Sequence, residues 1–491
     1  MDFGTSNSAA AIFDGSELRL VPLEQHTNIM PSAVYIDKDL KISTGQQAID
    51  SYIKSNMGRK VELSAELLGE ARTTTGQIGD RGLPEAAESQ KLYGQAFFDA
   101  GLQGRLFRGV KRLLGQKNTE RLMVFDKPFR LVALVTPILL RIREEVASLV
   151  AVAGVDNDFS GNGKRQSRHA HPTADHACLG HPVNFEGREK DHNITALRRL
   201  AEAGRYAGFD KQRYCPEPIA AAISYLHGDP QARHDLLLAV DFGGGTLDLC
   251  LLKRNQERFD VLATHGIGLG GDRIDQRLFR ELLFSQLGKG ERWRRKGEDR
   301  EIETLFPFEK YEDLLLNWAV SYMLNQNVYT APVMSRIEQG DEAAEKFRRL
   351  YELIKNNYSY LVFQAIKEMK ATLSNDTEAW LDIPEIDVKI HVTRDTLERC
   401  IADVLHDFRE SVVTILRQAD VSATSVNLVI RTGGSSLIPA VKQILEELFP
   451  QRVIEHDPFT SVAAGLAIAE YYQLDSAAGF DAGNASRRWH S

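Results

Sequence analysis

The sequence predicts an α/β protein made of two related lobes. Segments with the hydrophobic period of strands alternate along the chain with segments that have the period of helices, which is typical of this fold class. A motif of one aspartate, a turn of small residues and a strand occurs at the start of the chain and again about 240 residues later, which indicates an internal duplication. With 491 residues, the chain is long enough for two large lobes.

The composition is that of an ordinary soluble protein. Hydrophobic residues make up 43% and charged residues 26% of the chain, which excludes a wholly disordered, collagenous or membrane-embedded protein. The chain has 60 basic and 68 acidic side chains and a net charge of -8. This mild acidic excess argues against a general nucleic-acid binder, whose binding domain is basic.

The sequence predicts neither a membrane segment nor a secretory signal. The first residues lack a basic region followed by an apolar core, and the longest apolar run, at 131–140, contains Pro137 and is about half of a bilayer span. The 4 cysteines are far apart and form no CxxC motif, which argues against a zinc cage and favours a reducing compartment. We therefore expect a cytoplasmic location.

Lobe I is expected at residues 1–240. Strands are predicted at 9–13 and 18–21, because Asp14-Gly15 between two apolar runs is a strong hairpin signal. A peripheral subdomain at about 30–128 follows, and its polar residues 50–120 are expected to form loops. Helices are then expected at the following positions: 129–152, 193–208 and 218–228.

Residues 155–176 are predicted to form a flexible insertion, because they lack any hydrophobic period. His169, His171 and His176 lie in this segment. A metal site there stays an alternative, but nothing rigid is expected to present these side chains, so a solvated loop is favoured.

Lobe II is expected at residues 241–472, with a peripheral helical subdomain at about 286–388 and a disordered tail at 473–491. The charge run at 286–301 mixes both signs and predicts a solvated surface. The remaining predicted elements are two strands within 235–252, helices within 342–374, and a buried strand at 427–430 followed by a turn and a helix.

Three glycine-rich turns are the candidate functional motifs. The first is Asp2-Phe3-Gly4-Thr5-Ser6-Asn7, the second is Asp241-Phe242-Gly243-Gly244-Gly245-Thr246-Leu247-Asp248, and the third is Thr432-Gly433-Gly434-Ser435. Turns of small residues expose backbone N–H groups that bind anions. An aspartate at the end of a strand can hold hydrated Mg²⁺. Two such hairpins that face each other would hold a polyphosphate, and a third turn that opens a helix near Ser435 offers amides to a phosphate or ribose.

A single glycine turn is more often only structural, but three in this order favour a nucleotide site. Other nucleotide-binding classes are disfavoured. The chain has no GxxxxGK[ST] motif, and Asp-Phe-Gly occurs without the HRD signature of protein kinases. The GxGxxG match at 266–271 is followed by a charged region instead of a strand, which argues against a dinucleotide fold.

Seven segments in order resemble the ATPase domain of the seventy-kilodalton heat-shock chaperones (Hsp70 or DnaK type), within the superfamily of actin, sugar kinases and heat-shock proteins. They are DFGTSNS at 2–8, FRGVKRLLG at 107–115, PVNF at 182–185, EPIAAA at 217–222, DFGGGTLD at 241–248, LGG at 269–271 with Asp275, and GGS at 433–435. The resemblance implies an actin-like ATPase (ribonuclease H-like) fold with two duplicated lobes and a central nucleotide cleft.

The resemblance also implies a role for each matched residue. Lys111 would position the attacking water and offset the charge of the γ-phosphate, and Glu217 would hold that water or the hydrated magnesium. Asp2 and Asp241 would bind Mg²⁺ through water, and Asp248 would support the water network. The residues expected to bind the ATP or ADP itself are Gly4, Thr5, Ser6, Asn7, Gly243, Gly244, Gly245, Thr246, Gly271, Lys370, Ser374, Gly433, Gly434 and Ser435.

The sequence departs from the family at two positions of the adenosine site and at one further position. Ala371 and Leu437 stand where the family has the two arginines that enclose adenine, and Phe459 stands where it has an aspartate. Each lost cation–π contact weakens binding by about 1 kcal/mol. We therefore predict weak or altered base preference, which nanomolar ATP binding with strong discrimination against GTP would contradict.

The ends of the sequence also differ from the family. We expect no peptide-binding domain after the ATPase domain, and the resemblance is therefore to short DnaK-like proteins of the YegD type. Only Met1 precedes the first aspartate, which predicts a truncated start and a nearly unpaired central strand. The resemblance implies a slowly hydrolysing ATP-dependent switch, with unfolded polypeptide or a co-chaperone as partner. The alternatives are a small-molecule (sugar) kinase and an actin-like filament protein.

Overall fold

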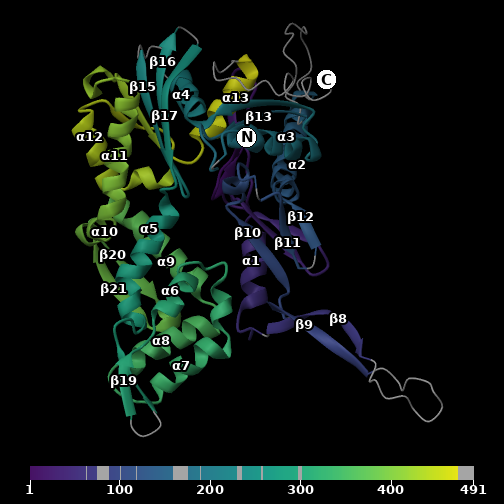
Figure 1. Ribbon diagram of the computed structural model, residues 1–491. Coiled ribbons are helices and arrows are strands. Elements are labelled where there is room, and N and C mark those ends of the chain that lie inside the picture. Colours follow the sequence, from purple (N-terminus) through teal and green to yellow (C-terminus); the bar gives the residue numbers. More distant parts are fainter. Residues whose placement is uncertain are drawn as a thin grey trace, which may run out of the picture.

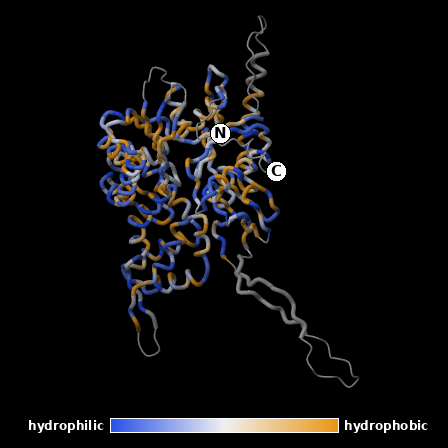
Figure 2. Tube along the Cα trace, turned by 45° about the horizontal axis from the view of Figure 1, so that its top comes forward, coloured by the Kyte–Doolittle hydropathy of each residue, from blue (hydrophilic) through white to orange (hydrophobic). Residues whose placement is uncertain are grey.

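The computed structural model describes residues 1–61, 63–73, 88–99, 101–117, 119–125, 127–158, 175–187, 189–228, 235–255, 258–296 and 301–473. These residues form two halves, each with a helix-covered sheet and a peripheral part that extends from it in the same direction (Figure 1). Lobe I here comprises the elements up to β14, and lobe II comprises β15 to β23. Hydrophobic segments run through the interior of both lobes (Figure 2).

Lobe II is built on five strands in the order β17-β16-β15-β22-β23. The bounds are β15 (Leu236–Phe242), β16 (Leu247–Asn255), β17 (Arg258–Ile267), β22 (Leu428–Thr432) and β23 (Val453–Glu455). Residues 237–240 of the middle strand are fully buried, as expected for a strand that is covered on both faces. The strands predicted within 235–252 and at 427–430 are confirmed.

Lobe I repeats this arrangement with shorter strands. The bounds are β1 (Asp2–Phe3), β2 (Asn7–Ala9), β3 (Ala11–Phe13), β4 (Leu18–Leu20), β5 (Ile29–Pro31), β13 (His176–His181) and β14 (Lys211–Pro216). β1 pairs with β2, β2 with β5, β3 with the predicted hairpin partner β4, and β13 with β14. If β2 and β3, which follow each other directly in the chain, are counted as one strand, the order across lobe I is β4, β2 with β3, β1, β13 and β14. This order corresponds to that of lobe II, as expected from the duplication that the repeated motif predicts.

The first strand is paired with β2 along its whole length, so the prediction that it is nearly unpaired is wrong on that side, whereas only Met1 links it to β13 on the other side. Asp2 lies opposite Ala9 on one side. On the other side, the Met1 ammonium donates to the carbonyl of Cys178 at 2.8 Å, and the N–H of Gly180 donates to the carbonyl of Met1 at 3.0 Å. The backbone of this one residue joins β1 to β13.

Two helices, α4 (Glu217–Gly228) and α13 (Ser461–Tyr472), pack against each other between the two sheets. α4 follows a strand of lobe I and covers β15 and β16 of lobe II, whereas α13 follows a strand of lobe II and covers β3 and β13 of lobe I. Small residues allow the close crossing, because a Cβ on Gly465 would lie 1.7 Å from the carbonyl oxygen of Ala220. The crossed helices thus connect the lobes at the closed end of the cleft.

The other helices of lobe I are α1 (Gly45–Asn56), α2 (Leu131–Asp158) and α3 (His192–Tyr206). The helices predicted at 129–152, 193–208 and 218–228 are therefore confirmed. The predicted insertion at 155–176 is wrong at its ends, because α2 continues to Asp158 and His176 opens β13. An isolated glycine such as Gly154 costs a helix only about 1 kcal/mol and does not end it. His169 and His171 lie outside the described residues.

The peripheral part of lobe I contains β6 (Ala33–Asp37), β7 (Ile42–Thr44), β8 (Leu63–Thr73), β9 (Glu88–Asp99), β10 (Gly104–Arg108), the short 3-10 helix η1 (Val110–Leu113), β11 (Arg121–Val124) and β12 (Lys127–Arg130). The loops expected over 50–120 are wrong for β8 and β9, which pair as an antiparallel hairpin. A two-stranded ribbon outside a larger sheet lacks the alternating apolar pattern by which strands are recognised.

The peripheral part of lobe II contains α5 (Gly271–Leu278), β18 (Arg292–Lys296), β19 (Glu301–Leu305), α6 (Glu309–Leu315), α7 (Asn327–Ile337), α8 (Ala344–Lys355), α9 (Ser359–Asn375), β20 (Glu378–Ile383), β21 (Val388–Thr393) and α10 (Arg394–Cys400). The helices predicted within 342–374 are confirmed. α11 (Ala402–Gln418) and α12 (Pro439–Leu448) cover the lobe II sheet.

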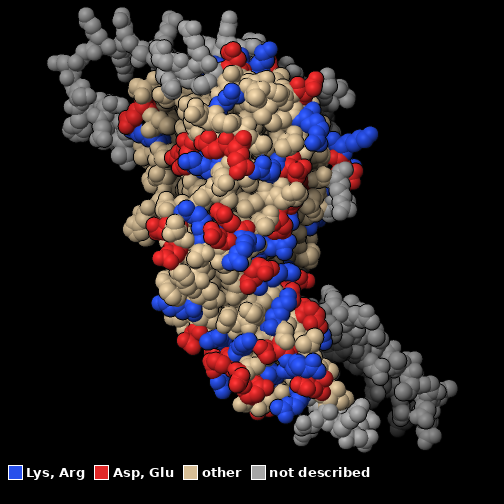
Figure 3. Space-filling view, turned by 90° about the vertical axis from the view of Figure 1, so that its left-hand side faces the viewer, with Lys and Arg blue, Asp and Glu red and all other residues tan. Residues whose placement is uncertain are grey.

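The surface carries mixed charge. In the hairpin β18–β19, Arg292 pairs with Glu303 at 3.5 Å and both side chains are more than half exposed, as expected of the charge run at 286–301. On the face of lobe II in Figure 3, basic and acidic residues alternate and no basic patch forms. None of the helices in the described ranges combines the length and the apolar character needed to cross a bilayer.

Candidate functional site

A cavity of about 910 Å³ lies between the two lobes. Asp2 and Asp241, on separate sheets, both line it. All but one of the other predicted site residues line it as well, namely Gly4, Thr5, Ser6, Asn7, Lys111, Glu217, Gly243, Gly244, Gly245, Thr246, Gly271, Lys370, Ser374, Gly433, Gly434 and Ser435. Asp248 is the exception, because it is buried behind Thr246, whose hydroxyl donates to its carboxylate at 2.8 Å.

The two aspartate-headed turns face each other at close range. A Cβ on Gly244 would lie 2.3 Å from Ser6 Oγ, and one on Gly245 would lie 2.8 Å from Thr5 Cγ2, so only glycine fits at both positions. Ser6 Oγ is buried and has no hydrogen-bond partner among the described residues. A buried hydroxyl without a partner costs about 1–3 kcal/mol, which an anionic oxygen between the turns would offset. This observation fits a bound phosphate.

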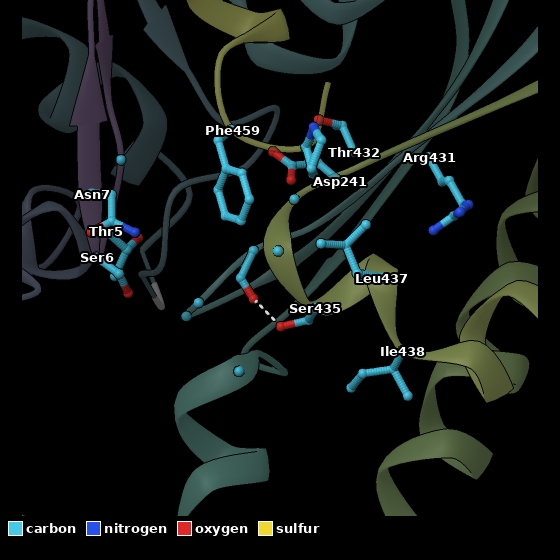
Figure 4. Close-up of a pocket in the computed structure, with 18 of the residues that line it drawn as sticks. Thr5, Ser6, Asn7, Asp241, Arg431, Thr432, Ser435, Leu437, Ile438 and Phe459 are labelled. Atoms are coloured by element: carbon cyan, nitrogen blue, oxygen red, sulfur yellow. Dashed lines mark hydrogen bonds between the residues drawn. The ribbon is translucent and has the colours of Figure 1, made fainter. Parts of the chain in front are cut away.

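The second turn is held rigidly through its carbonyl groups. The N–H groups of Gly271 and Asp272, at the start of α5, donate to the carbonyls of Gly243 and Gly244 at 3.0 and 2.8 Å. The Ser435 hydroxyl also donates to the Gly243 carbonyl, at 2.8 Å (dashed line in Figure 4). The start of α5 is thus occupied by the turn, which agrees with the argument against a dinucleotide site at 266–271.

The amides of the second turn are not equivalent. The N–H of Gly243 donates to the carbonyl of Thr246 at 3.1 Å and is therefore engaged. In the described part of the chain, no hydrogen bond uses the N–H groups of Gly244 and Gly245. Of the three amides predicted to bind phosphate, these two are the ones available.

A buried ion pair closes one end of the cavity. Lys111 belongs to η1 and Glu217 is the first residue of α4, and their side chains form a direct salt bridge with both groups less than a tenth exposed. Burial alone would lower the pKa of Lys111, but the negative charges of Glu217 and Asp2 outweigh it and raise that pKa. The ammonium therefore keeps its proton at the place where the two turns meet.

Three aspartates around this pair hold protons more tightly than usual. Burial raises the pKa of Asp2 to about 7, and the charge of Glu217 adds to the shift. Burial likewise raises the pKa of Asp248 to about 7, against the opposing hydrogen bond from Thr246. The pKa of Asp241 rises well above its ordinary value, mainly because of burial and then because of Glu217. A cation bound beside these carboxylates would lower their pKa values again, because an opposite charge favours the ionised form.

The chemistry of the donor set fits Mg²⁺. This ion keeps several of its waters and needs only one or two protein carboxylates, which Asp2 and Asp241 can supply. The described residues contain no group of 3 or more His, Cys, Asp or Glu side chains that could hold a metal ion by themselves.

These raised pKa values predict that the stability of the metal-free protein depends on pH. The carboxyls of Asp2 and Asp248 ionise near 3.8 in the unfolded chain but only near 7 in the folded protein. Between these two pH values the folded state binds more protons than the unfolded state. The free energy of unfolding therefore falls as the pH rises from about 4 to about 7. Urea unfolding in EDTA at pH 5 and pH 7 measures this. Asp248→Asn should reduce the difference, and an equal pH dependence in this variant would contradict the assignment.

The third turn leads into the end of the cavity away from the ion pair. Gly433 has φ +81°, and a Cβ there would lie 2.5 Å from the backbone of Phe242, so glycine is required. The helix expected to open near Ser435 starts later, because Gly434–Leu437 form a short 3-10 helix (η7) and α12 begins at Pro439. A residue that precedes a proline avoids the helical conformation, which places the boundary after Ile438.

One face of α9 forms the opposite wall of this end. Residues 367, 370, 371, 374 and 375 line the cavity, and Lys370 pairs with Asp275 at 2.5 Å. Sequence reasoning named Lys370 and Ser374 but missed Lys367 and Asn375, which the helical period i, i+3, i+4 around Lys370 would have indicated. Other lining residues that carried no motif are Arg394, Arg431, Ile438, Pro439, Lys442 and Glu455.

Two duplicated lobes around a cleft that is lined by paired glycine turns define the actin-like ATPase fold. The family model described as "Hsp70 protein" matches residues 177–305 and 341–471, slightly more than half of the chain. The chain therefore belongs to the Hsp70 family, whose members bind ATP and are ATPases.

Curated relatives agree with this assignment. The chain is 27% identical to Chaperone protein dnaK1 of Synechocystis over 298 residues, which are 60% of this chain and 36% of the relative. It is 23% identical to Chaperone protein dnaK of Cyanidioschyzon merolae over 480 residues, 95% of this chain and 60% of the relative. It is 26% identical to Chaperone protein DnaK of Metamycoplasma hominis over 59% of this chain and 40% of the relative. The chain thus spans less than two thirds of each of these relatives.

Proposed function

We propose that this chain is a slowly hydrolysing, DnaK-like ATPase of the short YegD type, which binds ATP with Mg²⁺ in the cleft and acts as a nucleotide-dependent switch. The observation that carries the proposal is the buried Lys111–Glu217 pair beside two turns that face each other across the cavity. Catalysis of phosphoryl transfer depends mainly on positioning and on neutralising charge, and this arrangement supplies both.

The two turns would bind the phosphates. The free amides of Gly244 and Gly245 and the hydroxyls of Thr5 and Ser6 converge on the same gap, so they can donate to phosphate oxygens from both lobes. The Thr246 hydroxyl already donates to Asp248 and would reach a phosphate or the attacking water only as an acceptor or after rotation. Binding would therefore draw the two lobes together.

The ion pair would carry hydrolysis. The Lys111 ammonium donates one N–H to Glu217 and has further N–H groups with which to orient a water and stabilise the charge that develops on the γ-phosphate. Glu217 has a second carboxylate oxygen, which can accept a hydrogen bond from that water. Mg²⁺, when bound through water to Asp2 and Asp241, would neutralise charge on the phosphates.

The moving bodies would be the two lobes, expected at residues 1–240 and 241–472, hinged where α4 crosses α13. Residues 236–240 would move with lobe II, because they belong to its middle strand β15. We propose that the peripheral subdomains of the two lobes (about 30–128 and 286–388) change position with the bound nucleotide and that a partner recognises this change. The three relatives are named as chaperone proteins, which favours unfolded polypeptide or a co-chaperone as that partner. A cytoplasmic location remains a prediction from the cysteine content.

ATP hydrolysis measured with and without unfolded polypeptide, and with candidate sugars, tests the proposal. We expect slow, Mg²⁺-dependent release of phosphate without any sugar. Release of ADP only when a sugar is present would instead favour a small-molecule kinase, and the absence of any hydrolysis would refute the ATPase.

An aromatic contact joins the peripheral parts of the two lobes. The Tyr52 hydroxyl on α1 donates to the carbonyls of Trp318 and Ala319 in lobe II, at 3.1 and 2.8 Å, and its ring packs edge-to-face on Trp318. The Arg108 guanidinium lies 4.8 Å from the centre of the Trp318 ring. We propose that opening of this contact accompanies the separation of the lobes and thereby the release of nucleotide.

Tyr52→Phe is therefore expected to release nucleotide faster. A lost hydrogen bond of about 1 kcal/mol corresponds to about a fivefold higher release rate. Stopped-flow displacement of a fluorescent ATP analogue measures the rate. Tyr206→Phe, at an exposed tyrosine on α3, is the matched control and should leave the rate unchanged. Equal rates for both variants and the wild type would show that the contact does not gate release.

A further inference from the structure

An exposed aromatic ring lies in the wall of the cavity beside the third glycine turn. Phe459 is 46% exposed and lines the cavity, although most large apolar side chains of this lobe are buried. A Cβ on Gly434 would lie 2.9 Å from Phe459 Cε1, so the ring touches the backbone of the turn. Figure 4 shows the ring between the Thr5-Ser6-Asn7 turn and the segment around Ser435. An open aromatic face at this place is available to a flat ligand.

The backbone of Phe459 is fixed in this position. The Asp457 carboxylate accepts from the N–H groups of Phe459 and Thr460, each at 3.0 Å, and from the Thr460 hydroxyl at 2.5 Å. The N–H of Gly433 donates to the carbonyl of Pro458 at 3.0 Å. The backbone that carries the ring is thus tied to the third turn and to the start of α13, so little backbone entropy is lost when a ligand covers the ring.

Two apolar side chains share this part of the cavity wall with the ring, and the two arginines that line the cavity are engaged elsewhere. Leu437 and Ile438 line the same end of the cavity. Arg431 pairs with Glu455 and donates to the carbonyl of Ser436 at 2.6 Å.

Arg394, on the far wall, donates to the carbonyls of Leu373 and Asp376 at 3.1 and 2.7 Å. A flat ligand beside the ring therefore meets one aromatic face and the side chains of Leu437 and Ile438, while these two guanidinium groups are already bonded to the protein.

We infer that Phe459, together with Leu437 and Ile438, forms a stacking slot for the nucleobase and accepts adenine and guanine with similar affinity. The inference rests on the proposed binding of a nucleoside triphosphate in the cleft. Stacking of a base on an aromatic side chain is sequence-tolerant, because every base has a π face. Loss of such a contact weakens binding by about 5- to 150-fold.

Calorimetric titration of Mg²⁺ with ATP, GTP and inorganic tripolyphosphate into the wild type and two variants tests the slot. Phe459→Ala should weaken the binding of ATP and of GTP at least about fivefold and leave the affinity for tripolyphosphate unchanged. Phe459→Tyr keeps the π face and should bind all three like the wild type. Because the ring is half exposed, both variants should fold, which thermal unfolding by circular dichroism verifies.

Several results would overturn the inference. These are unchanged or tighter ATP binding by Phe459→Ala, an equal loss of tripolyphosphate affinity, and wild-type discrimination between ATP and GTP of more than about tenfold. If the wild type hydrolyses ATP and Phe459→Ala binds it equally well, the slot alone is refuted. If the wild type binds neither ATP nor tripolyphosphate, the slot and the proposed function both fail.

Discussion

Lys111→Met should reduce ATP hydrolysis about 100- to 1000-fold at saturating ATP, the effect usually seen when a preorganised charge is removed from a transition state. The ammonium is buried, keeps its proton and lies where the phosphate-binding turns meet, so no solvent group can replace it. Single-turnover hydrolysis measures the chemical step. Lys442→Met, which removes an exposed ammonium from the rim of the same cavity, is the control and should retain the wild-type rate. Wild-type hydrolysis by Lys111→Met would refute the catalytic role.

A second variant separates catalysis from stability. Lys111→Met leaves Glu217 buried without its partner, which costs about 3–5 kcal/mol in the free energy of unfolding. Adding Glu217→Gln removes the stranded charge and should restore most of this stability without restoring hydrolysis. Recovery of hydrolysis in the double variant would show that the lysine acts only by supporting the fold.

Gly465→Ala should destabilise the protein by about 3 kcal/mol, near the upper end of the usual cost of overpacking. The new methyl group would lie 1.7 Å from the carbonyl oxygen of Ala220, and that atom belongs to the backbone of α4, so one of the two crossed helices must move. Because α4 begins at Glu217, hydrolysis should fall as well. Urea unfolding measures the loss from the shift of the midpoint at constant m value.

Gly228→Ala is the matched control for this prediction. It adds the same methyl group at the other end of α4, where no atom of the described residues lies within 4 Å, and its helical backbone suits alanine. This change should be neutral or stabilising, by at most about 1 kcal/mol. A stability of Gly465→Ala within about 0.5 kcal/mol of the wild type would show that the helices do not cross as tightly as described.

The sequence predicted the fold class and most elements of the sheets, because both depend on local patterns. The Asp-Gly hairpin, the apolar run of β15 and the helical periods of α3 and α9 are examples. The pairing of Met1 with β13 was missed, since it depends on hydrogen bonds to residues that are distant in the sequence. The hairpin β8–β9 was missed because it lacks the pattern of a half-buried strand.

The candidate site, too, could be predicted only in part from local sequence patterns. Both phosphate-binding turns and the third turn follow from motifs, and the structure brings them to one cavity. The engaged amide of Gly243 and the position of Asp248 behind Thr246 follow from three-dimensional packing, which no spacing encodes. The ring of Phe459 was noticed only as a departure from the family pattern, and its place in the cavity gave it a role.

The most direct test of the account is a crystal structure of the protein with Mg²⁺ and a non-hydrolysable ATP analogue. The account predicts the γ-phosphate between the Thr5-Ser6 turn and the amides of Gly244 and Gly245, within reach of the Lys111 ammonium. A triphosphate bound elsewhere on the surface, with the gap between the two turns left empty under saturating analogue, would contradict it.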